Sequence, residues 1–115
     1  MVIDKEKFQE NFRHFDKELI TEIIDMFINE LPDRMSQLRQ NIDDIDMEAL
    51  RFNAHSLKGV IANFMADLPK THARLLEEKA KENDTSGLKD IYEDLQKSSE
   101  ELLNNLKEIQ IIYKN

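Results

Sequence analysis

The sequence of 115 residues contains no cysteine and only two glycines and two prolines. Without cysteine it forms no disulfide, thiolate metal site or cysteine nucleophile. So few glycines and prolines, with 35% charged and 40% hydrophobic residues, are typical of long helices joined by short turns. The sequence also lacks an apolar run of about 18 residues and a signal-peptide pattern. We therefore expect an all-α, cytoplasmic protein without direct membrane contact.

Positive charge is scarce overall but concentrated in one segment. The formal net charge is −8 at pH 7, which argues against a nucleic-acid partner, because binding nucleic acid requires clustered cations. Residues 49–75 nevertheless carry four cations and one anion, so this segment is +3 and the remainder of the chain is −11. A locally positive surface attracts an acidic or phosphorylated partner.

The chain has the length of one domain, so a single monomeric domain is expected over residues 1–115. Apolar residues recur at three- and four-residue steps in successive segments, which predicts amphipathic helices. The expected helices cover 3–14, 16–44, 46 to about 66, a segment from Asp67 onwards, and a segment after the turn at 83–87. Four long stripes connected by short turns predict an antiparallel up-down-up-down four-helix bundle with a short extra N-terminal helix.

Several details of these helices are also predicted. The apolar stripe of the second helix extends to Ile45, and that of the third extends through Met65 to Leu68. Pro32 lies within the second helix and predicts a kink near Glu30, because proline removes one backbone hydrogen bond. Aspartates that precede helices are good N-cap residues. The predicted N-caps are Asp4, Asp16, Asp46 and Asp67.

His55 is the candidate functional residue. At roughly 100° per residue, it lies about 135° from the centre of the apolar stripe of its helix, so its ring faces solvent. Gly59 follows one turn later on the same side, where glycine costs about 1 kcal/mol relative to alanine. A solvated face does not need glycine, but close approach by another molecule does. The other residues on or beside this surface are Arg51, Phe52, Lys58, Ala62 and Asn63.

The other titratable groups are interpreted as structural. His14 lies near the end of the first predicted helix, and His72 lies on the flank of the fourth. The acidic residues around the second turn are interpreted as a solvated turn and an acidic helix start, so no metal site is predicted. These acidic residues are Asp43, Asp44, Asp46 and Glu48.

The stretch Ala54-His55-Ser56-Leu57-Lys58-Gly59 resembles the Ala-His-x-Leu-Lys-Gly signature of histidine-containing phosphotransfer (HPt) domains. The similarity extends to residues on the neighbouring helices. These residues are Phe27, Pro32, Leu38, Asp46, Ala73, Leu76 and Glu77. The chain departs from the family pattern at Met65, where the family usually has glycine, and at Pro69, where it has an aliphatic residue.

The resemblance implies a phosphoprotein that acts as a phosphorelay intermediate in two-component signal transduction. His55 accepts a phosphoryl group from the phosphoaspartate of a receiver domain and passes it to another receiver, while Lys58 stabilises the phosphate charge. The docking surface is expected to consist of Arg51, Phe52, Gly59, Ala62 and Asn63. Mg²⁺ is expected on the receiver, and no cofactor on this chain. The expected upstream partner is a hybrid histidine kinase. The chain itself is either free-standing or a domain of such a kinase.

The residues themselves agree with a carrier that does not use ATP. Imidazole is partly unprotonated at neutral pH and therefore nucleophilic. The sequence has no glycine-rich phosphate loop and no Walker motif, so it is not expected to be an enzyme that phosphorylates itself from ATP.

Two alternatives remain open at this point. The dimerising helical domain of a histidine kinase also presents a histidine on a bundle, but an acidic residue normally follows that histidine. Ser56 follows His55 here. The second alternative is a helical interaction module without phosphoryl chemistry, which binds a partner through Phe52.

Overall fold

The protein is described by a computed structural model that covers residues 1–114. Its helices, in chain order, are α1 (Lys5–Asn11), α2 (Lys17–Asp43), α3 (Met47–Ala62), α4 (Asp67–Lys81) and α5 (Leu88–Lys114). No strand occurs within this described range, so the predicted all-α class is confirmed. None of the helices in residues 1–114 is both long and apolar enough to span a membrane.

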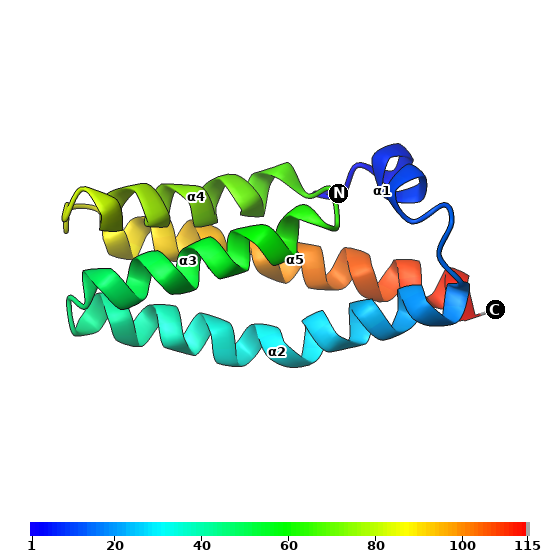
Figure 1. Ribbon diagram of the computed structural model, residues 1–115, viewed down its shortest axis with the longest axis horizontal. Helices are drawn as coiled ribbons and strands as arrows, with labels where there is room; N and C mark the ends of the chain where they lie inside the picture. Colours follow the sequence, from blue (N-terminus) through cyan, green and yellow to red (C-terminus); the bar gives the residue numbers. More distant parts are fainter. Residues whose placement is uncertain (115) are drawn as a thin grey trace.

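Helices α2 to α5 form the antiparallel bundle that was predicted. Each helix runs opposite to the one before it (Figure 1). In the ring of four, α2 and α4 each pack against both α3 and α5. The bundle is elongated, with extents of 45 × 22 × 21 Å. The solvent-facing sides of α3 and α4 therefore lie next to each other along its length.

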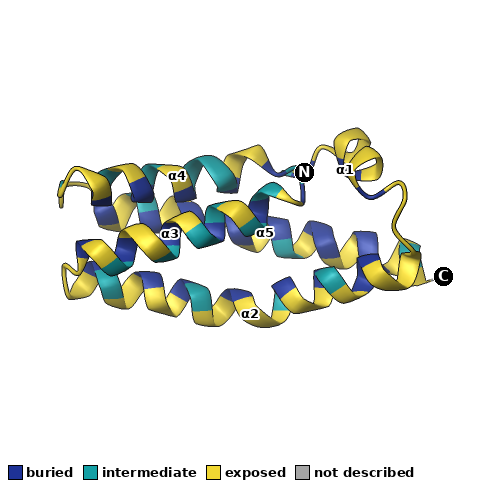
Figure 2. Ribbon diagram, in the orientation of Figure 1, coloured by how far each residue is buried: buried dark blue, intermediate teal, exposed yellow. Residues whose placement is uncertain are grey.

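The core lies along the axis of the bundle because every long helix has one apolar stripe. Figure 2 shows buried residues on the inner sides of the helices and exposed residues on their outer sides. The side chains that are completely buried include Ile24, Leu38, Leu50, Leu57, Leu76, Leu95, Leu102 and Leu106. They come from all four helices, so the bundle shares one hydrophobic core.

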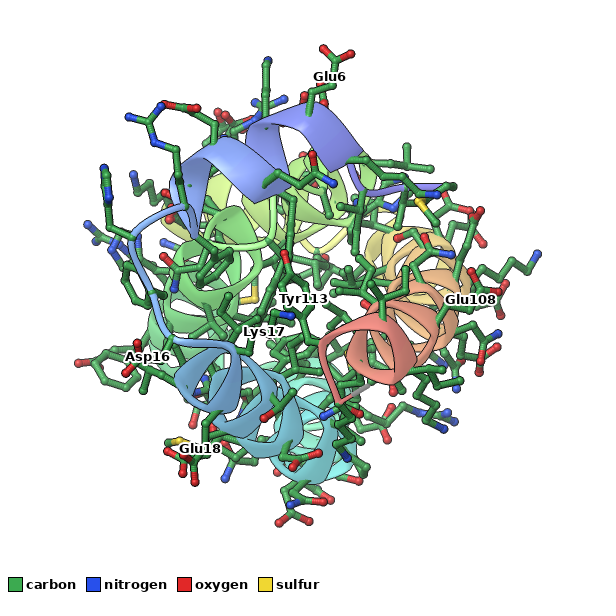
Figure 3. All side chains as sticks on the ribbon, turned by 90° about the vertical axis from the view of Figure 1, so that its right-hand side faces the viewer. Glu6, Asp16, Lys17, Glu18, Glu108 and Tyr113 are labelled. Carbon is green, nitrogen blue, oxygen red and sulfur yellow. The ribbon has the colours of Figure 1, made fainter. Side chains whose placement is uncertain are left out.

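The predicted short N-terminal helix, α1, covers one end of the bundle. Helices α2 and α5 have 27 residues each, whereas α3 and α4 have 16 and 15, so the longer pair extends beyond the shorter pair. Phe8 of α1 fills part of this end, with its ring centroid 6.5 Å from those of Phe64 and Tyr113. Figure 3 looks onto α1 and Tyr113 at this end.

The turn between α2 and α3 corrects one prediction. Ile45 was assigned to the apolar stripe of the second helix, but it is 60% exposed and has φ +53°. A left-handed residue after a helix reverses the chain and allows backbone N–H groups to bond the last carbonyls. Here the N–H of Asp46 donates to Asn41 O at 2.9 Å. The Asp46 side chain then accepts from Ala49 N, which confirms Asp46 as an N-cap.

The turn between α3 and α4 corrects three more predictions. Helix α3 ends at Ala62 rather than near residue 66, and Met65 has φ +56°. This left-handed residue redirects the chain, so Leu68 is exposed while Pro69 is buried in the first turn of α4. The N-cap is Ala66, and Asp67 is the first residue of the helix. A positive φ at Met65 also explains why glycine suits this position, since glycine adopts it without steric cost.

The first helix is shorter than the predicted range 3–14, since α1 spans Lys5–Asn11, but its predicted N-cap is confirmed. Asp4 caps α1 by accepting from Lys7 N. Asp16 occupies the N-cap position of α2, but its side chain makes no capping hydrogen bond. Pro32 lies inside α2 without ending it, because α2 continues to Asp43.

The positive φ of Ile45 makes this position a test of turn strain. A left-handed conformation costs an L-residue roughly 1–2 kcal/mol, and the side chain of Ile45 is too exposed to offset much of this. Ile45→Gly should raise the free energy of unfolding by about 0.5–1 kcal/mol, measured by urea denaturation. Ile45→Ala is the control, because alanine keeps the strained φ. A glycine variant no more stable than the alanine variant would contradict this explanation.

Candidate functional site

His55 lies on the outer face of α3, near its middle. The opposite face of this helix is completely buried through Leu50, Ala54 and Leu57, which fixes the direction in which the imidazole points. The His55 side chain is 70% exposed. The sequence-based prediction that this ring faces solvent is therefore confirmed.

Glu77 of α4 reaches across to the His55 ring. Its Oε2 lies 2.8 Å from His55 Nδ1, and its Oε1 lies 3.2 Å from the same nitrogen. Lys58 donates to the same carboxylate, with Nζ 2.7 Å from Oε1 and 3.1 Å from Oε2. The Glu77 side chain is only 3% exposed, whereas that of Lys58 is 26% exposed. One buried carboxylate thus contacts both His55 and Lys58, the two residues expected to take part in phosphoryl transfer.

The surroundings of Glu77 and His55 determine where the protons of these two side chains lie. Burial by itself would raise the pKa of Glu77, but hydrogen bonds from Lys58 and His55, with the positive charge of Lys58 and of His55 when it is protonated, outweigh it and lower the pKa. Glu77 is therefore ionised and acts only as an acceptor. The Nδ1 of a neutral His55 must then carry the hydrogen that it donates to Glu77. The other ring nitrogen, Nε2, is left with a free lone pair on an exposed ring.

Sequence reasoning did not find the interaction between Glu77 and His55. The residue had been noted only as part of the resemblance to HPt domains. A signal was present, since Glu77 follows Ala73 by four residues and precedes Ala80 by three, all on the buried side of α4. A charged residue on an apolar stripe requires a partner. The sequence did not show which partner, because that depends on how α3 packs against α4.

The surface beside His55 is open in one direction and grooved in the other. A Cβ atom added to Gly59 would meet nothing within 4 Å, so the fold itself does not require glycine there. On the other side of His55 is a shallow groove of about 390 Å³. Its lining residues are Glu48, Arg51, Phe52, His55, Glu77 and Lys81. Lys81, in the last turn of α4, adds a cation to the surface that sequence reasoning had not included.

The residues of the predicted docking surface differ in how far they are exposed. Phe52 is 74% exposed, and Arg51 is also exposed. Ala62 is half-buried, so it adds less surface than predicted. Asn63 is exposed, but its backbone carbonyl accepts a hydrogen bond from Asn11 Nδ2 at 3.1 Å. The end of α1 therefore lies beside the end of this surface.

The other two histidines have different surroundings. His72 is half-buried, and its Nδ1 lies 2.8 Å from Ser98 Oγ on α5, so its ring points towards α5 and not towards His55. His14 is exposed in the connection between α1 and α2. Within residues 1–114, no three or more acidic or histidine side chains are grouped closely enough to hold a metal ion.

Comparison with known proteins identifies a similar family and a similar fold. The family model described as "Hpt domain" matches residues 22–110. The crystal structure of histidine-containing phosphotransfer protein B (HptB) from Pseudomonas aeruginosa PAO1 is similar, with a TM-score of 0.78 and 21% sequence identity over 97% of this chain and 90% of that chain. At this identity the similarity establishes the fold. No curated protein sequence matches the chain.

The lowered pKa of Glu77 leads to a prediction about stability and pH. A carboxyl group whose pKa is lower in the folded state stabilises the protein above its unfolded pKa, and this contribution disappears as the pH falls through the folded pKa. Glu77→Gln should lower the free energy of unfolding at pH 7 by about 1–2 kcal/mol, because charge-assisted hydrogen bonds are lost. The difference from the parent should shrink below about pH 4.5, in urea titrations at several pH values.

Glu78→Gln provides the matched control. Glu78 is the next residue on α4 and is exposed, with its carboxylate bound to Arg74 at 2.7 Å. Removing this charge should change the stability at pH 7 by less than about 0.5 kcal/mol. A loss as large as that in Glu77→Gln would mean that net charge, and not the buried contact, sets the stability.

Proposed function

Since this chain belongs to the Hpt domain family, we propose that it is a phosphorelay intermediate that carries a phosphoryl group on His55. Hpt domains relay phosphoryl groups with receiver domains. The donor would therefore be the phosphoaspartate of one receiver, and the acceptor would be the aspartate of another. The family assignment favours this function over the kinase-dimerisation and passive-binding alternatives.

The observation that carries the proposal is the hydrogen bond that determines which nitrogen of the His55 ring carries the hydrogen. The Glu77 carboxylate lies 2.8 Å from Nδ1 and fixes the hydrogen on that nitrogen, so the exposed Nε2 is the nucleophile. The Nε2 lone pair forms a bond to phosphorus while the bond from phosphorus to the aspartate oxygen breaks. The electron pair of that bond leaves with the aspartate carboxylate. No nucleotide takes part, and Mg²⁺ remains with the receiver.

The positively charged side chains near His55 would attract the negatively charged phosphoryl group and its receiver. Lys58 lies one helical turn from His55 and shares the Glu77 carboxylate with it. Its ammonium is close enough to be drawn to phosphoryl oxygens, which would offset their negative charge. Arg51 on the rim of the groove would attract the acidic surface of a receiver.

Docking requires surface that the receiver can approach closely. Gly59 provides open space one turn after His55, and Phe52 offers an exposed aromatic ring one turn before it. Exposed aromatic residues are common anchors at protein interfaces. We therefore propose that the receiver covers the outer face of α3 from Phe52 to Gly59, with its phosphoaspartate above His55.

The phosphoacceptor is tested by replacing His55. His55→Gln should fold like the parent, because the side chain is exposed, and it should accept no acid-labile phosphate from phosphorylated receiver domains. His14→Gln and His72→Gln are the matched controls and should accept phosphate at the rate of the parent. Acid-labile phosphate on the His55→Gln variant would show that another residue is the acceptor.

Gly59 tests the docking surface independently of the acceptor. Gly59→Ala should raise the stability by up to about 1 kcal/mol, because alanine favours a helix and the added Cβ meets no neighbour. Gly59→Glu should also fold, but its bulk and negative charge should slow phosphoryl transfer from the receiver by at least about tenfold, equal to about 1.4 kcal/mol. Transfer to Gly59→Glu at the parent's rate would place the receiver elsewhere.

A further inference from the structure

The carboxylate beside His55 has a further consequence once the ring is phosphorylated. Resting on the function proposed above, we propose that Glu77 keeps the proton on Nδ1 of the phosphorylated ring. The carrier can then release its phosphoryl group at neutral pH without taking up a proton. Glu77 would act through the ring as a positioning residue that sets how readily the phosphoryl group leaves.

The first step of the argument is the charge change on phosphorylation. The attacking Nε2 uses its lone pair to bond phosphorus, while Nδ1 keeps the hydrogen that it donates to Glu77. The ring therefore becomes a cation with one substituent, phosphoryl, on Nε2 and one hydrogen on Nδ1. An ionised carboxylate 2.8 Å away stabilises this cation. An uncharged hydrogen-bond acceptor would orient the ring but would stabilise its charge far less.

The second step concerns release. When the bond from Nε2 to phosphorus breaks, the electron pair returns to Nε2. If Nδ1 carries its proton, the leaving group is a neutral imidazole. If Nδ1 has lost it, the leaving group is an imidazolate anion, which is a much poorer leaving group. Transfer to a receiver aspartate and attack by water both follow this scheme, and water attack on the protonated form yields dihydrogen phosphate and neutral His55.

Lys58 must change its contact for this arrangement to work. In the unphosphorylated protein, Lys58 and His55 share one carboxylate, so the Lys58 charge partly cancels the effect of Glu77 on the ring. The oxygens of an arriving phosphoryl group carry more negative charge in total than the Glu77 carboxylate. The partly exposed Lys58 side chain can turn towards them. The result is two pairs of opposite charge. The protonated ring and Glu77 form a neutral pair, while Lys58 offsets one of the two negative charges of the phosphoryl group.

The other charged groups around the ring have weaker effects. Glu48 and Arg51 of α3 and Lys81 of α4 line the groove with His55, and all three are exposed to solvent, which screens them. On the α2 side, Arg34 donates to Ser56 Oγ at 3.0 Å and pairs with Glu30 at 3.5 Å. Glu77 differs from these groups because it is buried and because its carboxylate is hydrogen-bonded directly to the ring.

The experiment compares the parent with Glu77→Gln, which keeps a hydrogen-bond acceptor near Nδ1 but removes its charge. Each protein is phosphorylated by a phosphorylated receiver domain and then separated from it. The loss of acid-labile phosphate is followed from about pH 5 to about pH 10. The midpoint at which release slows should lie about 1–3 pH units lower in Glu77→Gln than in the parent. At neutral pH the variant's phosphohistidine should last longer, by up to about tenfold for each pH unit of this shift.

The control and a second readout separate charge from structural damage. Glu78→Gln carries the same change in net charge and should match the parent. In the parent alone, ¹⁵N NMR of the phosphorylated ring should show Nδ1 protonated to a higher pH in the folded protein than in the same protein unfolded in urea. This measurement tests the inference even if Glu77→Gln does not fold.

The outcomes distinguish the inference from the function on which it rests. Identical pH profiles for the parent and Glu77→Gln, or equal Nδ1 titration in the folded and unfolded protein, would overturn the role of Glu77 while leaving His55 as the carrier. If the parent takes up no phosphate on His55 from any receiver, the proposed function and this inference both fail.

Discussion

The candidate site depends on one electrostatic constraint, which is that a buried carboxylate must be paired. Glu77 is almost completely buried, and breaking such a pairing is costly because the remaining charge has no solvent to stabilise it. His55 and Lys58 both satisfy this carboxylate. The same contact therefore joins α3 to α4, sets which ring nitrogen carries hydrogen and holds the lysine near the ring.

The bundle gives this contact a rigid setting without enclosing it. His55 and Lys58 are on α3 and Glu77 is on α4, so regular helices rather than mobile loops hold the three side chains. The buried stripe of α3 leaves its opposite face free for a partner. The buried carboxylate and the exposed imidazole thus come together at a boundary between core and solvent. A partner that covers His55 would exclude water and strengthen these electrostatic interactions.

The errors in predicting the fold all occurred at turns. Ile45 and Met65 both have a positive φ, which ends the preceding helix and rotates the following residues away from the expected face. Both residues are apolar, so a periodicity argument places them in the core stripe. Apolar spacing indicates which face of a helix is buried, but it contains no information about where the backbone leaves the helical conformation.

The sequence by itself determined the all-α class, the order of the helices and the outward direction of His55, because these follow from the local spacing of apolar residues. It also marked Gly59 as unusual, since its cost is local to one helix. Only the tertiary structure decided that Glu77 binds His55 and Lys58, which lie 22 and 19 positions away in the sequence. That contact depends on the packing of α3 against α4, and helical periodicity does not specify which side chains meet between two helices.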